Sequence, residues 1–225
     1  MGDRAAKDAL YEGLATAARA VANGRRAELV DVLAQGERSV EALATEIGQS
    51  VANTSQHLRI LAGSGLVASR RDGTRVIYRL AGAEVEALWA ALRAVATAHV
   101  AGIERLSTAY LGDRDGLEQV TRQELARRLR ADGVVAWDVR PLAEYTAGHI
   151  KGAVSVPPGE VRRRLRGVPI DVDVVAYCRG PFCVYADDAV RALTRKGRRA
   201  VRLEDGFPEW RQAGLPVVAG VETGS

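Results

Sequence analysis

The chain has 225 residues, enough for one large domain or two ordinary ones, and contains 47% hydrophobic and 27% charged residues. This composition is that of a globular protein and excludes a disordered or fibrous one. The net charge of +4 permits nucleic-acid binding without demonstrating it. No stretch has the apolar length of a membrane span, and the start lacks the apolar core of a signal peptide, so we expect a cytoplasmic protein with no membrane segment.

The sequence is expected to form two domains, because its pattern changes near the middle. A helical apolar pattern stops in STAYLGDRDGL, a stretch with two glycines and mixed charges. We therefore predict a first domain over residues 1–106, a linker over 107–117 and a second domain over 118–225. Residues 1–112 hold 13 Lys+Arg against 12 Asp+Glu, so an argument for DNA binding must rest on where these charges lie.

The first half is predicted to be mostly helical, because its apolar residues recur at helical spacing. Ser39 and Ser50 are suited to cap helices, and Asp72-Gly73 between two strand-like runs predicts a hairpin. The expected elements are a helix that ends at Asn23-Gly24, helices over 25–34, after Ser39, over 51–62 and over 84–106, and a hairpin over 66–80.

The predicted helix over 51–62 has one largely apolar side and one polar side. A helix that reads DNA buries one side on its domain and offers the other to the major groove. The side expected to be buried carries Val51, Thr54, Leu58 and Leu61. The side expected to contact base edges and phosphates carries Asn53, Ser55, Gln56 and Arg59.

The hairpin that follows carries a group of arginines, with Asp72 as the only acid among them. Positive charge here suits a wing that lies along the phosphate backbone, although the charges alone fit a solvated hairpin equally well. The arginines are Arg70, Arg71, Arg75 and Arg79.

Residues 5–106 resemble the ArsR/SmtB family of bacterial repressors through the segment LATEIGQSVANTSQHLRILAGSGLVASRRDGTRVIYRL. The resemblance implies a winged helix-turn-helix domain of the α+β class, with DNA contacts by Ser55, Gln56 and Arg59 and with Asn53 nearby. It also implies a homodimer formed through the first and last helices. A two-fold dimer would bind a palindromic operator in double-stranded DNA.

The first half departs from metal-sensing members of that family, which use cysteine pairs or paired His and carboxylate ligands. Residues 1–177 contain no cysteine, and the last predicted helix has His99 and Glu104 but no second His. His57 matches a position where the family often has His, and we interpret it as facing phosphate or as structural. We therefore expect no metal and no cofactor.

The second half is predicted to be an α/β domain, because short strands alternate with helices. The continuous apolar runs Val134–Trp137 and Val174–Tyr177 suit central strands of a parallel sheet. Thr121–Glu124 forms a capping box that predicts a helix start. A further helix is expected over 184–196 and a strand over 200–203.

The two cysteines of the chain, Cys178 and Cys183, lie close together after an apolar strand. In a reducing compartment this spacing favours chemistry over a structural disulfide, although two buried small residues are an alternative. A loop between a strand and a helix offers inward N–H groups and the positive end of a helix dipole. That environment stabilises a thiolate, and Arg179 adds positive charge.

Residues 116–220 resemble the rhodanese family of sulfurtransferases, through DVR, EYTAGHIKGA and DGFPEWRQAGLPV. The resemblance implies that Cys178 holds the catalytic position that carries a persulfide. It implies that Asp138 and Arg140 hold the frame of the active site, that His149 is structural and that Trp210 packs in the core.

The cysteine loop departs from the commonest rhodanese pattern, which ends on arginine where this chain has Cys183. The change argues against phosphatase or arsenate-reducing chemistry, which needs that arginine for the oxyanion. Cys183 could instead attack a persulfide on Cys178 and release sulfide, or simply fill the apolar side of the loop.

Two hypotheses of function follow from these patterns. In the first, the protein is a DNA-binding repressor whose rhodanese-like domain senses a small sulfur donor, such as thiosulfate, polysulfide or a persulfide. In the second, the domain is an active thiosulfate or polysulfide sulfurtransferase with a DNA-binding head. The cysteine at position 183 favours sensing over turnover.

Overall fold

The computed structural model describes residues 3–131, 133–167 and 172–220. It divides into two compact units, Met1–Arg93 and Ala94–Ser225. The division falls inside helix α5 (Ala83–His99), and helix α6 (Ile103–Leu111) includes the first residues of the predicted linker. The predicted domain bounds therefore stay a prediction, and each unit is described by itself.

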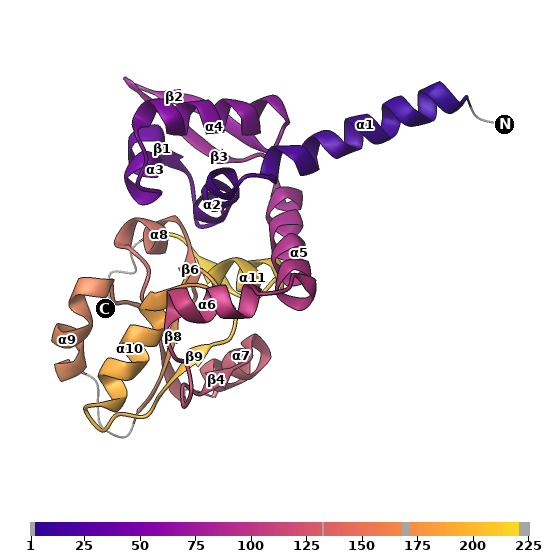
Figure 1. Cartoon of the computed structure of the whole chain (residues 1–225). Coiled ribbons are helices and arrows are strands. Elements are labelled where there is room, and N and C mark those ends of the chain that lie inside the picture. The colour runs from indigo at the N-terminus through magenta and orange to yellow at the C-terminus, as the bar shows by residue number, and fades with distance from the viewer. Residues whose placement is uncertain (1–2, 132, 168–171, 221–225) are drawn as a thin grey trace. The chain divides into compact units, whose positions relative to one another are not determined.

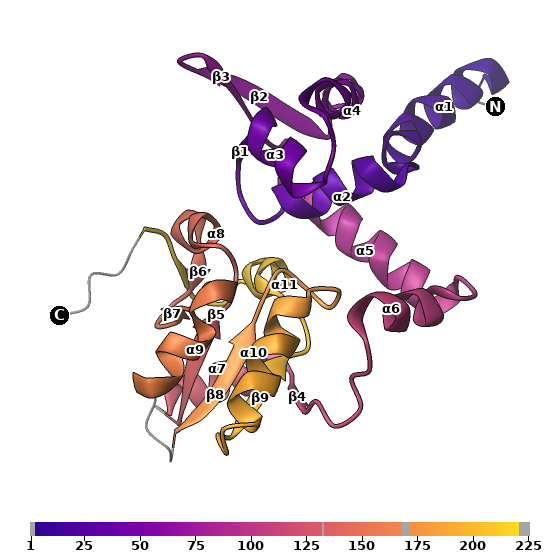
Figure 2. The same cartoon turned by 60° about the vertical axis from the view of Figure 1, so that its left-hand side comes forward.

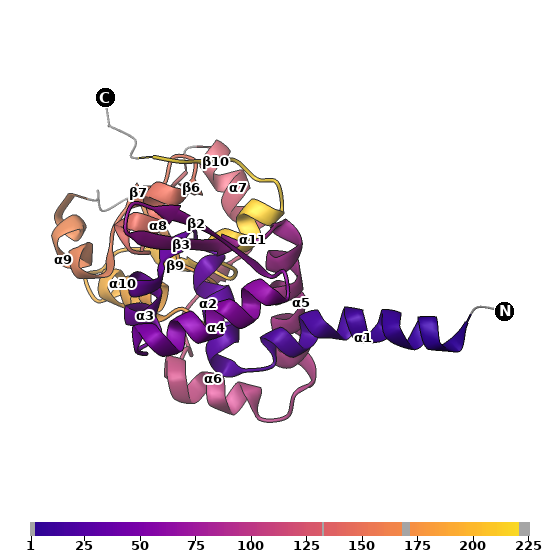
Figure 3. The same ribbon diagram turned by 90° about the horizontal axis from the view of Figure 1, so that it is seen from above.

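The first unit contains the four helices predicted before residue 66 and the predicted hairpin (Figures 1 and 3). Ser39 and Ser50 cap helices as expected, since their side chains accept hydrogen bonds from the amides of Ala42 and Asn53. The three strands pair antiparallel in the order β1-β3-β2. The elements before α5 are α1 (Arg4–Val21), α2 (Gly24–Leu33), β1 (Arg38–Ser39), α3 (Val40–Glu46), α4 (Val51–Gly63), β2 (Val67–Asp72) and β3 (Arg75–Leu80).

The hairpin turns as the sequence predicts. Asp72 pairs with Arg75, so Gly73 and Thr74 form the turn, and the positive φ of Gly73 (59°) is readily accessible to glycine. The core beneath it is formed by buried apolar residues of α2, α3 and α4, among them Leu29, Leu33, Leu43, Leu58 and Leu61. The arrangement is a winged helix-turn-helix, as expected.

The expected single helix over 84–106 was wrong. The segment forms two helices, α5 and α6, and Gly102 between them has a left-handed backbone (φ 86°, ψ −5°). The apolar spacing continues across the break, so periodicity could not reveal it. The available signal was Gly102, because glycine is among the poorest helix formers and the residue that adopts positive φ most readily.

The second unit is built on a five-stranded parallel sheet in the order β4-β9-β8-β5-β7 (Figure 2). A separate antiparallel pair joins β6 and β10. The elements are β4 (Gln119–Val120), α7 (Arg122–Arg130), β5 (Val134–Asp138), α8 (Leu142–Ala147), β6 (His149–Ile150), β7 (Val154–Ser155), η1 (Pro158–Glu160), α9 (Val161–Arg164), η2 (Leu165–Gly167), β8 (Asp173–Tyr177), α10 (Val184–Thr194), β9 (Ala200–Leu203), α11 (Phe207–Gln212) and β10 (Val217–Val218).

The two faces of this sheet carry separate hydrophobic cores. Helices α7 and α11 pack on the face that bears Val175 and Tyr177. Helices α9 and α10 pack on the other face, which bears Val174 and Ala176, and the core on this face also includes Cys178. Because side chains alternate along a strand, the continuous apolar run of β8 is covered on both sides, as predicted for a central strand.

Among the residues that the structure describes, no helix is both long enough and apolar enough to cross a membrane.

Candidate DNA-binding surface and cysteine loop

Helix α4 presents the polar side that the sequence predicted. Asn53, Gln56 and Arg59 are exposed and Ser55 is half-buried, while Thr54, Leu58 and Leu61 are buried. The prediction that Val51 is buried was wrong, because this first residue of α4 is 47% exposed. Its position at the start of the helix, one turn before Thr54, leaves it at the edge of the core.

The wing arginines differ in their surroundings. Arg70, Arg71 and Arg75 are all exposed, but the guanidinium of Arg70 also pairs with Glu37 and lies 3.6 Å from the carboxylate of Asp72. The hydrogen bond from Arg70 lowers the pKa of Glu37 and keeps this carboxylate charged. Glu37 was missed from the sequence because it lies 33 residues before its partner.

The cysteine loop joins β8 to α10. Cys178 follows β8 directly and is buried, and Cys183 occupies the N-cap position of α10 and is half-buried. The two residues form a disulfide, with their Cα atoms 6.2 Å apart. The expectation that the second thiol lies within reach of the first is therefore confirmed, although the sequence argument had not favoured a structural disulfide.

The loop offers an anion fewer donors than the sequence argument assumed. Pro181 has no N–H group, and the amide of Cys183 donates to the carbonyl of Gly180 at 3.2 Å. Arg179 was expected to add positive charge near the cysteines, but its guanidinium bonds to the buried carboxylate of Glu144 at 2.6 Å. Its charge is thereby largely balanced.

Asp138 and Arg140 lie in a fully buried network (side-chain exposure 0%) that holds the ends of the central strands. The Arg140 guanidinium donates to the Asp138 carboxylate at 2.5 Å and to the carbonyl of Gly148 at 2.7 Å. The Tyr177 hydroxyl donates to Asp138 at 2.7 Å, and burial together with this carboxylate raises the pKa of Tyr177 well above its usual value. Burial opposes the charge of Arg140, but Asp138 raises its pKa overall.

The start of α11 and the glycine before it contact the cysteine loop. The amide of Phe207 donates to the carbonyl of Cys178 at 3.0 Å. A Cβ atom on Gly206 would lie 2.4 Å from the carbonyl carbon of Arg179 and 2.4 Å from the amide nitrogen of Gly180. Glycine is therefore required at this position by the close approach of two backbones, although its own φ is negative.

Arg114 also contacts the loop and was not recognised from the sequence. Its guanidinium donates to the buried carboxylate of Asp187 in α10 and to the carbonyl of Pro181, at 2.6 and 2.7 Å. The segment that follows α6 is thus attached to the loop that carries the cysteines.

Comparisons with known proteins agree with this architecture. Residues 23–69 match the model of the bacterial regulatory proteins of the arsR family, and residues 121–213 match that of the rhodanese-like domain. The HTH-type transcriptional regulator Rv0324 of Mycobacterium tuberculosis is 47% identical over 218 residues, which cover 97% of this chain and 96% of that protein. The chain belongs to the ArsR family of transcriptional regulators and carries a rhodanese-like domain.

Two further similarities each cover one half of this ArsR-family regulator. A sulfurtransferase of Allochromatium vinosum is 32% identical over 105 residues, or 46% of this chain and 96% of that protein. The solution structure of Mb0332 from Mycobacterium bovis, described as a homodimeric winged helix-turn-helix DNA-binding domain, is 46% identical. It covers 44% of this chain and 91% of that one with a TM-score of 0.41.

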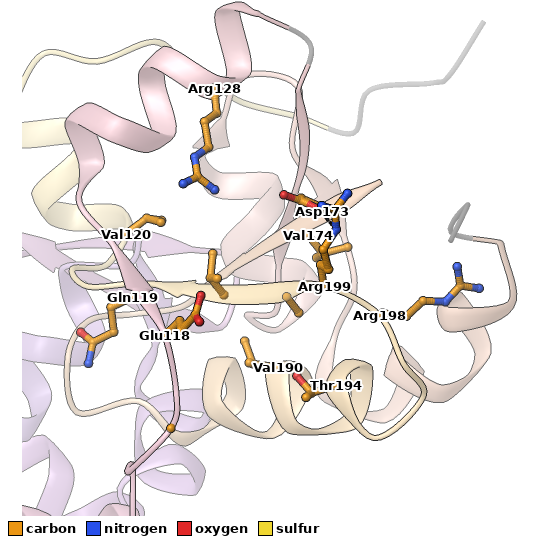
Figure 4. Close-up of a pocket in the computed structure, with 13 residues that line it drawn as sticks. Glu118, Gln119, Val120, Arg128, Asp173, Val174, Val190, Thr194, Arg198 and Arg199 are labelled. Atoms are coloured by element: carbon orange, nitrogen blue, oxygen red, sulfur yellow. Dashed lines mark ion pairs between the residues drawn. The ribbon is translucent and has the colours of Figure 1, made fainter. Parts of the chain in front are cut away.

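The regulator also has a cavity of about 560 Å³ at the edge of the sheet where β8 and β9 begin (Figure 4). Arg199 and Asp173 line this cavity and form an ion pair with an N–O distance of 2.8 Å. Cys178 follows the opposite end of β8, so this cavity is not part of the cysteine site. Within the described ranges, no group of three or more His, Cys, Asp or Glu residues is arranged to hold a metal ion.

Replacing Gly206 with alanine is expected to destabilise the regulator by about 1–3 kcal/mol, because the new methyl group forces the loop backbone to shift. Urea unfolding of the full chain measures the change. Gly159→Ala is the matched control, since a Cβ atom there meets nothing within 4 Å. Equal stability of the two variants would show that the close approach at Gly206 imposes no constraint.

Proposed function

We propose that this regulator binds palindromic operator DNA as a homodimeric repressor and senses sulfane sulfur through Cys178 and Cys183. The observation that carries the proposal is the disulfide that joins the two cysteines across the loop from β8 to α10. A second thiol stands there in place of the arginine that the rhodanese pattern would have.

The DNA side of the proposal rests on helix α4 and the wing. Asn53, Ser55, Gln56 and Arg59 lie on the side of α4 that faces away from the core, where amide, hydroxyl and guanidinium groups could contact base edges. The exposed Val51 adds an apolar group suited to a thymine methyl. Arg71 and Arg75 supply positive charge for the phosphate backbone.

A homodimer is supported by apolar side chains that the first unit leaves exposed on two helices. Helix α1 exposes Leu10, Tyr11 and Leu14, and α5 exposes Leu88 and Leu92. Apolar residues grouped on helix faces in this way are typical of a subunit interface. Two-fold symmetry would then present two copies of α4 to two half-sites of an operator. A repressor that acts on chromosomal DNA works in the cytoplasm.

The sulfur chemistry proceeds by two successive thiol-exchange steps. The Cys178 thiolate attacks a sulfur–sulfur bond of a polysulfide, which leaves as a chain shorter by the transferred sulfur, and Cys178 becomes a persulfide. The Cys183 thiolate then attacks the Sγ atom of Cys178 and expels hydrosulfide. The two thiols lose two electrons to the sulfane sulfur and form the Cys178–Cys183 disulfide.

This reaction is expected to weaken operator binding, because the family is composed mainly of repressors that release DNA when their signal arrives. The effect requires that the reduced and reacted forms differ in affinity for DNA. Turnover of thiosulfate is the alternative activity, and release of thiocyanate from thiosulfate and cyanide would measure it.

Intact mass spectrometry of the reduced regulator exposed to polysulfide tests the chemistry. We expect wild type to lose two hydrogens, Cys183→Ser to gain one sulfur and keep it, and Cys178→Ser to do neither. The Cys183→Ser arm separates loading from resolution. An unchanged mass in both wild type and Cys183→Ser would contradict a sulfur-sensing role for Cys178.

The salt dependence of operator affinity tests the wing. Arg71→Ala is expected to reduce the slope of log K against log salt by about 2 per dimer, since each lost phosphate contact lowers it by about 0.9. Arg70→Ala is expected to reduce it by less than half of that, because Glu37 already holds Arg70. Fluorescence anisotropy measures both, with the exposed Arg130→Ala on α7 as a control, and equal effects at positions 70 and 71 would contradict this difference.

A further inference from the structure

Arg114 connects three groups that belong to the cysteine loop and to the helix after it. Its Nε donates to Asp187 Oδ2 at 2.6 Å, Nη1 donates to the carbonyl oxygen of Pro181 at 2.7 Å and Nη2 donates to that of Cys183 at 3.5 Å. Only a planar guanidinium offers several donors in this fixed fork. One side chain therefore holds both the loop backbone and α10.

The carboxylate that Arg114 binds has a second positively charged neighbour. Asp187 is fully buried in the first turn of α10, and Arg202 of β9 lies 3.3 Å from its Oδ1. The Arg114 side chain is 22% exposed, so it links this buried carboxylate to the surface segment from which it comes. Asp187 thus links Arg114 to the start of α10.

Hydrogen bonds within segment 112–118, which follows α6, order the backbone on both sides of Arg114. The Asp113 carboxylate accepts from the amide of Asp115 at 2.7 Å, and the amide of Leu117 donates to the carbonyl of Arg114 at 3.0 Å. Leu117 packs against the core that contains Cys178. The chain leads from this segment back through α6 and α5 to the DNA-binding half.

The carbonyl groups held by Arg114 belong to the residues that the disulfide closes into a ring. Pro181 lies inside that ring and Cys183 is one of its ends. In the dithiol form, and with a persulfide on Cys178, no bond joins Cys178 to Cys183, so the covalent restraint on the loop is lost. Asp187 moves with α10, so the carbonyl of Pro181 in the loop is then no longer constrained to keep its present distance from Arg114.

We propose that Arg114 is the positioning residue that couples the sulfur state of the Cys178–Cys183 pair to the order of segment 112–118. The inference rests on the proposed function, because the sulfur donor is the signal that changes the state of the two cysteines. Arg114 is the group that transmits this change from the loop to segment 112–118. By linkage, a contact that is stronger in the disulfide form also stabilises the disulfide. The same residue therefore sets how readily the pair is oxidised.

The test uses the full chain, with glutathione disulfide as oxidant and neither DNA nor a sulfur donor. The dithiol gives up two electrons and two protons, and one glutathione disulfide becomes two glutathione molecules. Arg114→Lys is the main variant, because its ammonium can still pair with Asp187 but cannot form the fork to both carbonyl groups. Arg191→Ala is the matched control, because Arg191 in the last turn of α10 donates to the carbonyl of Asp113 and so holds segment 112–118 at a different point.

In wild type we expect hydrogen exchange of the amides in segment 112–118 to be slower in the disulfide form than in the dithiol form. Arg114→Lys is expected to abolish that difference and to lower the equilibrium constant for disulfide formation about fivefold or more. Arg191→Ala is expected to speed exchange in both forms and leave the equilibrium constant unchanged. An Arg114→Lys variant with the wild-type equilibrium constant and the wild-type difference in exchange would overturn the proposal.

Failure here is distinguishable from failure of the proposed function. If polysulfide does not react with Cys178 while the exchange and redox results hold, the coupling stands and the sulfur signal is wrong. If polysulfide reacts but Arg114→Lys behaves as wild type, the signal stands and Arg114 does not carry it.

Discussion

The loop from β8 to α10 has to bring Cys178 and Cys183 together while its backbone stays pressed against Gly206. The amide of Phe207 holds the carbonyl of Cys178, and the absence of a side chain on Gly206 lets the two backbones approach closely. This close approach leaves the loop backbone at Arg179 and Gly180 little room to shift toward Gly206. Farther along the same loop, Arg114 holds the carbonyl groups of Pro181 and Cys183.

Most of the ion pairs discussed above act on their immediate surroundings. The buried pair of Asp138 with Arg140 and the pair of half-buried Arg179 with buried Glu144 each balance a positive charge beside the loop. On the wing, Glu37 pairs with Arg70, while Arg71 and Arg75 lie nearer the turn and are exposed. Binding of this regulator to DNA therefore depends on a few placed side chains, since the first half of the chain has almost no net charge.

The sequence predicted most elements because apolar periodicity, serine caps and the Asp72-Gly73 turn are local signals. It failed where a local rule met a competing one. Gly102 breaks the continuous apolar stripe of segment 84–106, and Val51 fits the apolar side of α4 but lies outside the core. The site was predicted only at its cysteines and its buried frame. Glu37 with Arg70 and Arg114 with Asp187 are pairs separated by 33 and 73 residues, and only the folded chain brings them together.

The central claim is that the sulfur state of Cys178 and operator DNA influence each other. Reciprocity gives the most direct measurement: the equilibrium between dithiol and disulfide forms of the full chain, titrated with and without saturating operator DNA. The account predicts that operator DNA disfavours the disulfide by the same factor, per site, by which the disulfide weakens operator binding. An identical equilibrium with and without DNA would show that the cysteine loop and the DNA-binding half act independently.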